Sequence, residues 1–192
     1  MKSLEMKPSR DFDKINFSVG DILFHPLHGL CEIKAVVDEE FLGQRSLCYL
    51  IEPKRHERAN TRFMIALEQI FEAGFHPPIS TEEVQKILEY LKNADAGSTL
   101  NVEKAVEMVY GLAKENTPWA FAKIIYILAF GVNHVCSRHE REVLKRAVQG
   151  LTREMALVLK LSASQASSLI QRSLGPSLRS NTWIRGELER VE

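Results

Sequence analysis

Residues 75–83, with the sequence FHPPISTEE, mark the point where one kind of structure gives way to another. Pro77 and Pro78 lack backbone N–H groups, so the pair can neither continue a strand nor enter the interior of a helix. Residues 80–83 (STEE) have the form of a helix N-cap, with acidic side chains placed where they favour the helix dipole. The chain is therefore expected to change from sheet to helix here.

Upstream of this boundary the sequence has the pattern of short strands. Apolar runs are separated by turn signals at intervals of about 8–12 residues, which is typical of a small barrel or curled sheet. In one run Cys31, Ile33 and Ala35 alternate with charged or polar neighbours, as in a half-buried strand. The expected strands lie within residues 17–26, 30–37, 46–51 and 61–65.

Downstream the apolar period becomes helical. A third helix, beginning near Pro118, is apolar almost all round and is expected to be central and buried. The other helices are expected after Ser80 and over residues 102–114, 137–159 and 164–172. The fold class predicted is therefore α+β, with a β module at 15–76 and an all-α helical domain at 80–174. Residues 1–14 are expected to be a disordered lead-in and 175–192 a tail. Two alternatives stay open for residues 162–192, which either fold on the helices or serve as a separate arm.

Charge and cysteine content limit the functional classes. The chain has 192 residues with 25 Lys and Arg against 25 Asp and Glu, so its formal net charge is zero. Proteins that bind nucleic acid by charge alone are usually basic, so contact with DNA must be local, assisted by a partner, or absent. Three cysteines without a C-x-x-C pair favour a reducing compartment. With no apolar leader and no long apolar run, a cytoplasmic protein without a membrane partner is expected.

The chemistry of catalysis is largely missing from the sequence. No phosphate-binding glycine loop, nucleophile elbow or H-E-x-x-H motif is present. His25 and His28 flank Pro26 and are expected to form a turn whose rings pack on the sheet. The densest group of possible metal ligands lies across a predicted loop and the start of the next helix. A capped helix start with exposed histidines explains these residues better than a zinc site does. That group is His134, Cys136, His139 and Glu140. We expect no enzyme activity, no metal, no cofactor and no small-molecule substrate.

Several basic and aromatic residues are candidates for binding. Residues 54–58 (KRHER) form a short basic cluster, for which a solvated hairpin tip is the competing explanation. Trp119 is expected in the core, whereas Trp183 suits either a surface contact or docking of the tail. A basic helical face is predicted to line DNA, although acidic neighbours dilute its charge. The basic residues are Arg138, Arg141, Lys145, Arg146 and Arg153, and the acidic ones are Glu140, Glu142 and Glu154.

The order of the motifs resembles that of the CarD/CdnL family of bacterial RNA polymerase-binding transcription regulators. Residues 17–21 (FSVGD) and 26–29 (PLHG) are similar to the start of the family's polymerase-interacting module. Residues 64–67 (MIAL) resemble its closing strand, with Ala66 where the family usually has proline. Ser137, Glu140, Arg141 and Leu144, followed by Ala147, Leu151 and Glu154, resemble its paired-helix ending.

The resemblance implies a Tudor-like/SH3-like barrel that binds the β subunit of RNA polymerase. It also implies a helical domain that contacts promoter DNA at the edge of the melted bubble, where a tryptophan wedge stabilises the open complex. Leu100 occupies the place of that tryptophan here, which implies weak or altered DNA contact. The predicted DNA-binding residues are Leu100, Arg138, Arg141, Lys145 and Arg146.

A sheet edge would suit pairing with a strand of the polymerase. We predict this edge around residues 46–51, with Arg62 near the surface of the fourth strand. The predicted partner-binding residues are Leu47, Tyr49, Ile51, Arg62 and Met64. Two alternatives stay open: an adaptor with the same fold that does not contact promoter DNA, and an enzyme whose site is assembled from scattered residues.

Overall fold

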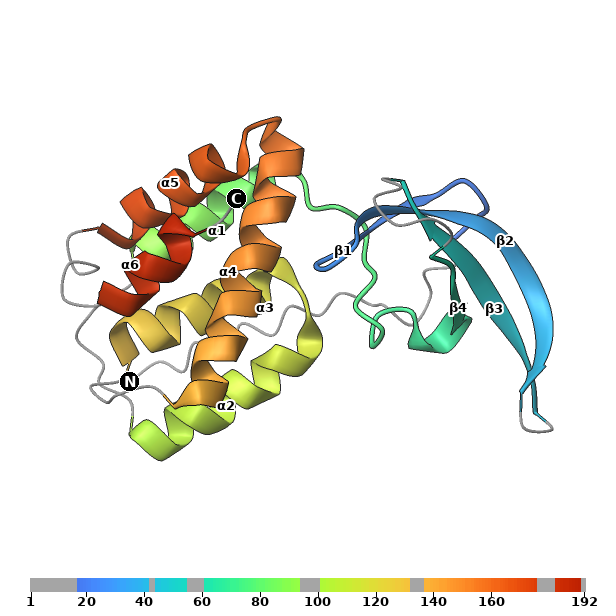
Figure 1. The fold of residues 1–192 in the computed structure, drawn as a ribbon, viewed down its shortest axis with the longest axis horizontal. Helices are drawn as coiled ribbons and strands as arrows, with labels where there is room; N and C mark the ends of the chain where they lie inside the picture. The colour runs from blue at the N-terminus through green and yellow to red at the C-terminus, as the bar shows by residue number, and fades with distance from the viewer. Residues whose placement is uncertain are drawn as a thin grey trace.

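The computed structural model describes residues 17–41, 44–54, 61–93, 101–131, 137–175 and 182–190. An antiparallel sheet is followed in the chain by a group of helices, and the two parts lie side by side (Figure 1). The predicted α+β order, sheet first and helices second, is confirmed. The expected lead-in, residues 1–14, lies outside the described residues. Among those that are described, no helix is both long enough and apolar enough to cross a membrane.

The sheet has the strand order β1-β2-β3-β4, and every neighbouring pair is antiparallel. The outer edge of β1 is bridged by His76, which pairs with Phe24. β2 and β3 are much longer than the other two strands, so they project beyond the core as a two-stranded arm (Figure 1). The strands are β1 (Ile22–His25), β2 (Gly29–Phe41), β3 (Gln44–Pro53) and β4 (Phe63–Ala66), followed by the 3₁₀ turn η2 (Leu67–Gln69).

A β-bulge in β2 changes which side chains face the core. Ile33 lies opposite Ile51, but Ala35 lies opposite Leu50, so Lys34 is an extra residue on β2. The simple alternation through Cys31, Ile33 and Ala35 therefore stops at Ile33. Beyond the bulge, Ala35 lies on the outer face of the sheet.

The module has a core of its own. Its buried side chains come from three strands and from the segment after η2, and Phe17 and Phe63 pack against them. The members are Leu23, Cys31, Ile33, Tyr49, Ile51, Ile70 and Phe75. Phe17 is fixed by a hydrogen bond from its backbone N–H to the Tyr49 hydroxyl, 3.0 Å long.

Three helices begin at the caps that the sequence predicts, and the helix expected from residue 164 begins at Ala163 with Ser162 as its cap. Ser80, Ser137 and Ser162 each form a capping box with the residue three positions on, and Thr117 caps the helix that has Pro118 in its first turn. The helices are α1 (Thr81–Lys92), α2 (Val102–Glu115), α3 (Pro118–Tyr126), α4 (Arg138–Leu159), α5 (Ala163–Leu174) and α6 (Thr182–Glu189).

The third helix is central, as its apolar sequence predicts. Phe121, Ile124 and Ile125 are buried in a core shared with the other helices. After Tyr126 the chain continues as the π-helical segment η3 (Ile127–Gly131), rather than as regular α-helix.

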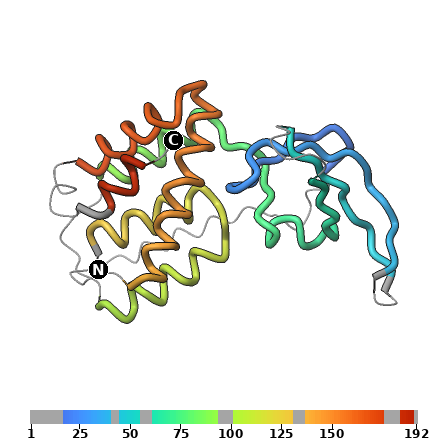
Figure 2. Tube along the Cα trace, in the orientation of Figure 1, coloured from blue at the N-terminus to red at the C-terminus, as the bar shows by residue number. Residues whose placement is uncertain are grey.

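The end of the chain packs on the helices. Ile184 and Leu188 of α6 are buried in the helical core, and the Ser167 hydroxyl donates to the Leu188 carbonyl. Figure 2 traces α6 back beside α5 and α4, with which it is in contact. Over residues 182–189, the alternative of a tail that folds on the helices is therefore the one found.

Candidate functional site

The fourth strand forms an open edge of the sheet. β4 pairs with β3 through Phe63–Ala66, and no described residue pairs with its other side. Met64 is 55% exposed on this edge strand. Just before it, the largely exposed Arg62 places its guanidinium Nε 2.8 Å from a carboxylate oxygen of Glu52. This edge leaves backbone groups available for another strand.

The third strand is not an edge, which corrects the sequence prediction. β3 is held by β2 on one side and by β4 on the other. Of its three predicted partner-binding residues, Tyr49 is 1% exposed, Ile51 is 0% exposed and Leu47 is 53% exposed. The alternation of the strand points Tyr49 and Ile51 into the module core, so their side chains cannot contact a partner. Leu47 lies further along the strand, on the projecting arm.

An apolar strip that sequence reasoning missed crosses the outer face of the sheet. Because Ala35 lies opposite Leu50, and Leu50 opposite Met64, these three side chains form one row across β2, β3 and β4. Val37, Cys48 and Ala66 form the next row. All of these residues except Cys48 are at least partly exposed. We call these six residues the outer strip; only the bulge reveals it, because it moves Ala35 to this face.

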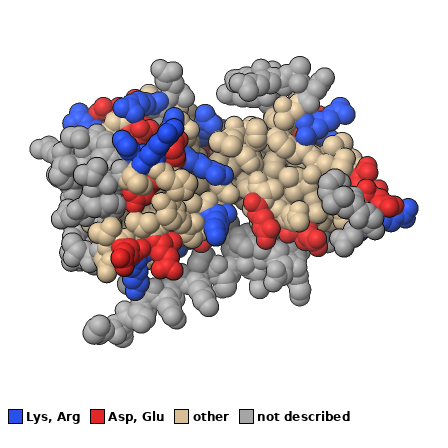
Figure 3. Space-filling view, turned by 60° about the horizontal axis from the view of Figure 1, so that its bottom comes forward, with Lys and Arg blue, Asp and Glu red and all other residues tan. Residues whose placement is uncertain are grey.

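The basic face of α4 is less diluted by acidic residues than its sequence suggests. Glu140 is 2% exposed and Glu154 is 0% exposed, so of the three acidic neighbours only Glu142 lies at the surface. Arg138, Arg141 and Lys145 are exposed. Figure 3 shows Lys and Arg side chains over the helical part of the molecule, with Asp and Glu side chains among them.

The remaining basic candidates fall into different surroundings. The Arg146 guanidinium donates to Asn116 Oδ1 at 2.7 Å and so is partly engaged within the protein. Arg153 donates to the Pro26 carbonyl at 3.3 Å, which joins α4 to the turn between β1 and β2. Leu100 lies outside the described residues, so its wedge role stays a prediction. Residues 55–58 of the short basic cluster also lie outside them.

The histidines at the turn between β1 and β2 pack on the sheet, as expected. Ring centroids of His25 and Phe75 are 4.8 Å apart, and those of His28 and Phe63 are 4.6 Å apart. Burial, with the nearby His28 ring as the second cause, lowers the pKa of His25 to about 4. The Leu27 N–H donates to Nδ1 of His25 at 3.1 Å, which fixes the neutral ring's tautomer.

The described residues do not assemble a metal centre, and the Cys31 thiol is buried. No group of three or more His, Cys, Asp or Glu side chains in that part of the chain is placed to hold a metal ion. Burial raises the pKa of the Cys31 thiol to about 12, so the reactive thiolate is scarce at neutral pH. Of the ligand group considered from the sequence, His134 and Cys136 lie outside the described residues.

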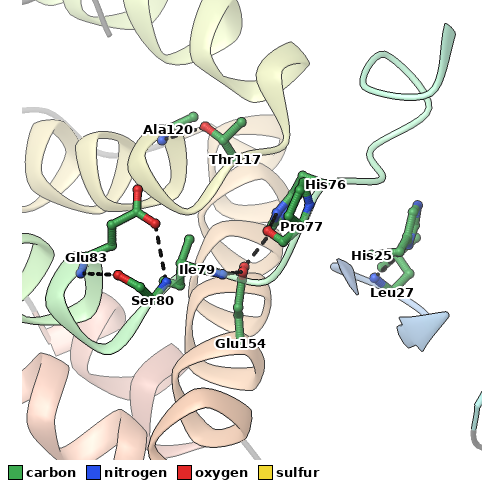
Figure 4. Close-up of polar contacts among 10 residues, drawn as sticks. All are labelled: His25, Leu27, His76, Pro77, Ile79, Ser80, Glu83, Thr117, Ala120 and Glu154. Carbon is green, nitrogen blue, oxygen red and sulfur yellow. Dashed lines mark hydrogen bonds and ion pairs between the residues drawn. The ribbon is translucent and has the colours of Figure 1, made fainter. Parts of the chain in front are cut away.

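The junction between the two parts is built from polar groups (Figure 4). Glu154 Oε1 accepts a hydrogen bond from the Ile79 N–H at 3.0 Å. Glu154 Oε2 lies 3.6 Å from Nε2 of His76. A carboxylate on α4 thus contacts the segment that leads from the sheet to α1.

Comparison with known proteins gives two matches. Residues 17–72 match the family model described as the CarD-like/TRCF RID domain. A Bacillus subtilis (strain 168) protein named "Putative transcription factor YdeB" is 20% identical over 153 residues, covering 79% of this chain and 98% of that protein.

Proposed function

We propose that this chain, whose residues 17–72 match the model of the CarD-like/TRCF RID domain, is a cytoplasmic transcription regulator of that family that binds the β subunit of RNA polymerase. The observation that carries the proposal is the combination of this family match with an open strand edge at β4. The similarity to the Bacillus protein named as a transcription factor supports the same class of function over most of the chain.

The polymerase contact is a strand added to the sheet. A partner strand that pairs with the free side of β4 gains main-chain hydrogen bonds, and side-chain pockets beside it supply specificity. Met64 and Leu50 of the outer strip form an apolar surface next to that edge. Arg62 lies at the polar rim of this contact, whereas the exposed Leu47 shares the face of Tyr49 and Ile51 and so lies on the opposite side of the arm.

The DNA contact is made by the exposed basic residues of α4. Arg138, Arg141 and Lys145 neutralise backbone phosphates, which gives affinity without base readout. Because the net charge of the chain is zero, this contact is weak alone and acts when the polymerase holds the protein at a promoter. Leu100 is proposed as an apolar wedge that helps to stabilise the open complex.

Biolayer interferometry with core RNA polymerase tests the first contact. We expect Met64→Glu to weaken binding about tenfold, equivalent to ~1.4 kcal/mol, because it places a charge in a dry apolar surface. Met108→Glu is the matched control, because Met108 is also exposed, at 41%, but lies on α2. Equal binding by the two variants would remove β4 from the interface, and no binding by the parent chain would refute the proposal.

The alternative function is an adaptor that binds polymerase but does not contact promoter DNA, and the neutral net charge favours it. Binding of the polymerase complex to forked promoter DNA as salt is varied separates the two. For a regulator, the Arg141→Gln/Lys145→Gln variant lowers the slope of log affinity against log salt by about one for each phosphate that is no longer neutralised. Lys86→Gln, an exposed lysine on α1, serves as the control. An unchanged slope in the double variant favours the adaptor.

A further inference from the structure

The segment between the sheet and the first helix is fixed to the sheet by His76. The His76 N–H donates to the Phe24 carbonyl at 3.1 Å, and the Phe24 N–H donates to the His76 carbonyl at 2.7 Å. The two rings also pack together, with centroids 5.7 Å apart. His76 therefore moves with the β module.

The side chain of the same residue faces the helices. Its Nε2 lies 3.6 Å from Oε2 of Glu154, which is fully buried on α4. The other oxygen of that carboxylate accepts the Ile79 N–H at 3.0 Å, just before α1 begins (Figure 4). One carboxylate of the helical part therefore contacts both ends of the connecting segment.

The hydrogen bond at Nδ1 orients the His76 ring toward the carboxylate of Glu154. Nδ1 of His76 lies 2.9 Å from the Pro77 carbonyl oxygen, which can only accept, so Nδ1 carries a hydrogen. Nε2 then faces the carboxylate, and its 3.6 Å separation from Oε2 is that of an ion pair when the imidazole carries a second hydrogen on Nε2. Little water competes at this buried position, so the attraction is stronger than that of an exposed pair.

Two further contacts come from the same side of α4. Arg153, next to Glu154, donates to the Pro26 carbonyl at 3.3 Å. Arg146, two turns earlier, donates to Asn116, whose Cβ lies 3.7 Å from where a side chain on Gly74 would begin. Residues seven or eight positions apart share a helix face, so this face of α4 is turned toward the module.

We propose that His76 and Glu154 form a clasp that fixes the orientation of the β module on α4. The clasp lies near one end of α4, and the exposed Arg138 and Arg141 lie near the other. A helix of 22 residues is about 33 Å long, so a small rotation at the clasp moves Arg138 and Arg141 a long way. The clasp therefore sets where these two side chains lie relative to a partner that binds the β module. The clasp does not depend on the proposed function, because it is a contact within the chain that needs no partner.

Residual dipolar couplings of the full chain test the clasp. In the parent, one alignment tensor is expected to fit the backbone couplings of both the sheet and the helices. In Glu154→Gln, which keeps an acceptor for Ile79 but loses the charge, two different tensors are expected. Glu140→Gln is the matched control, because Glu140 is also buried on α4 but caps the helix start beside Ser137. This control is expected to keep a single tensor.

His76→Leu provides a second, independent test, because it removes the ring but leaves the backbone bridge to Phe24. If Glu154→Gln does not fold, the His76→Leu variant alone tests whether the clasp fixes the orientation of the module. A single tensor in His76→Leu, or two tensors in the parent chain, would overturn the clasp. Polymerase is absent from this experiment, so its outcome is independent of the polymerase-binding test.

Discussion

At the scale of single residues, the surroundings of His25 control the protonation of its ring. Its ring is buried between His28 and Phe75, and Nδ1 accepts a hydrogen bond, so the neutral form fits the site. Burial and the positive charges of nearby groups, among them His28 and Arg146, hold its pKa at about 4. A charged ring at this position would be unfavourable, because burial removes its hydration and Arg146 repels it.

We therefore expect the stability of the protein to depend on pH through His25. The unfolded chain binds a proton on this residue near pH 6.5, and the folded chain only near pH 4. Between these values the unfolded state binds more protons, so the free energy of unfolding falls as pH falls from 6.5 toward 4. The full stability contributed by the neutral ring is present above pH 6.5.

Urea denaturation at pH 7 and pH 5 measures this effect. Between pH 7 and pH 5, the free energy of unfolding of the parent is expected to fall by about 1 kcal/mol more than that of His25→Leu. Between pH 7 and pH 8 the two proteins should show the same change. An equal loss in both proteins from pH 7 to pH 5 would show that His25 is not the group responsible.

At the scale of elements, the close approach of α3 and α4 depends on a glycine. A Cβ added to Gly150 would lie 2.5 Å from Cε2 of Phe121 and 3.0 Å from Cδ2. Phe121 is part of the helical core and is fully buried, so its ring has little room to move. The absence of a side chain at Gly150 therefore sets the distance between the two helices.

Substitution of two helical glycines separates packing from backbone effects. Gly150→Ala is expected to lower the free energy of unfolding, because overpacking costs about 1–3 kcal/mol and the gain in helix propensity is only about 1 kcal/mol. Gly111→Ala is the matched control: a side chain on this exposed residue of α2 would meet nothing within 4 Å. It is expected to raise stability by about 0.5–1 kcal/mol. Thermal unfolding, followed by circular dichroism, measures the stability of both variants. A Gly150→Ala variant more stable than the parent would show that the Phe121 ring moves to make room for the new side chain.

At the scale of the whole molecule, the protein has two hydrophobic cores joined by a polar clasp. The core of the module and that of the helices have no residue in common. Both tryptophans, Trp119 and Trp183, lie in helices, so intrinsic tryptophan fluorescence reports on the helical part alone. The two parts are therefore expected to respond separately to substitutions in either core.

Ile51→Ala tests this separation. Loss of a fully buried isoleucine is expected to destabilise the module by about 2–5 kcal/mol. Hydrogen exchange of β3 amides should accelerate accordingly, whereas the urea midpoint of tryptophan fluorescence should shift much less. A fluorescence midpoint that shifts by the full amount would instead show that the sheet and helices unfold as one unit.

The sequence by itself determined the order of the fold and where several of its helices begin. Pro77 and Pro78 cannot continue a strand, and Ser80, Ser137 and Pro118 act on backbone groups within a few residues. These signals are local, so they can be read from the order of residues alone. The order of the motifs likewise indicated the family whose model matches residues 17–72.

Only the tertiary structure decided which of the candidate residues face a partner. The bulge at Lys34 reverses the alternation of β2, and the pairing of β3 on both sides buries Tyr49 and Ile51 and leaves β4 as the edge. Likewise Glu154, which by sequence weakens the basic face of α4, is buried against His76. Strand pairing and burial depend on residues far apart in the chain, so spacing along the sequence does not specify them.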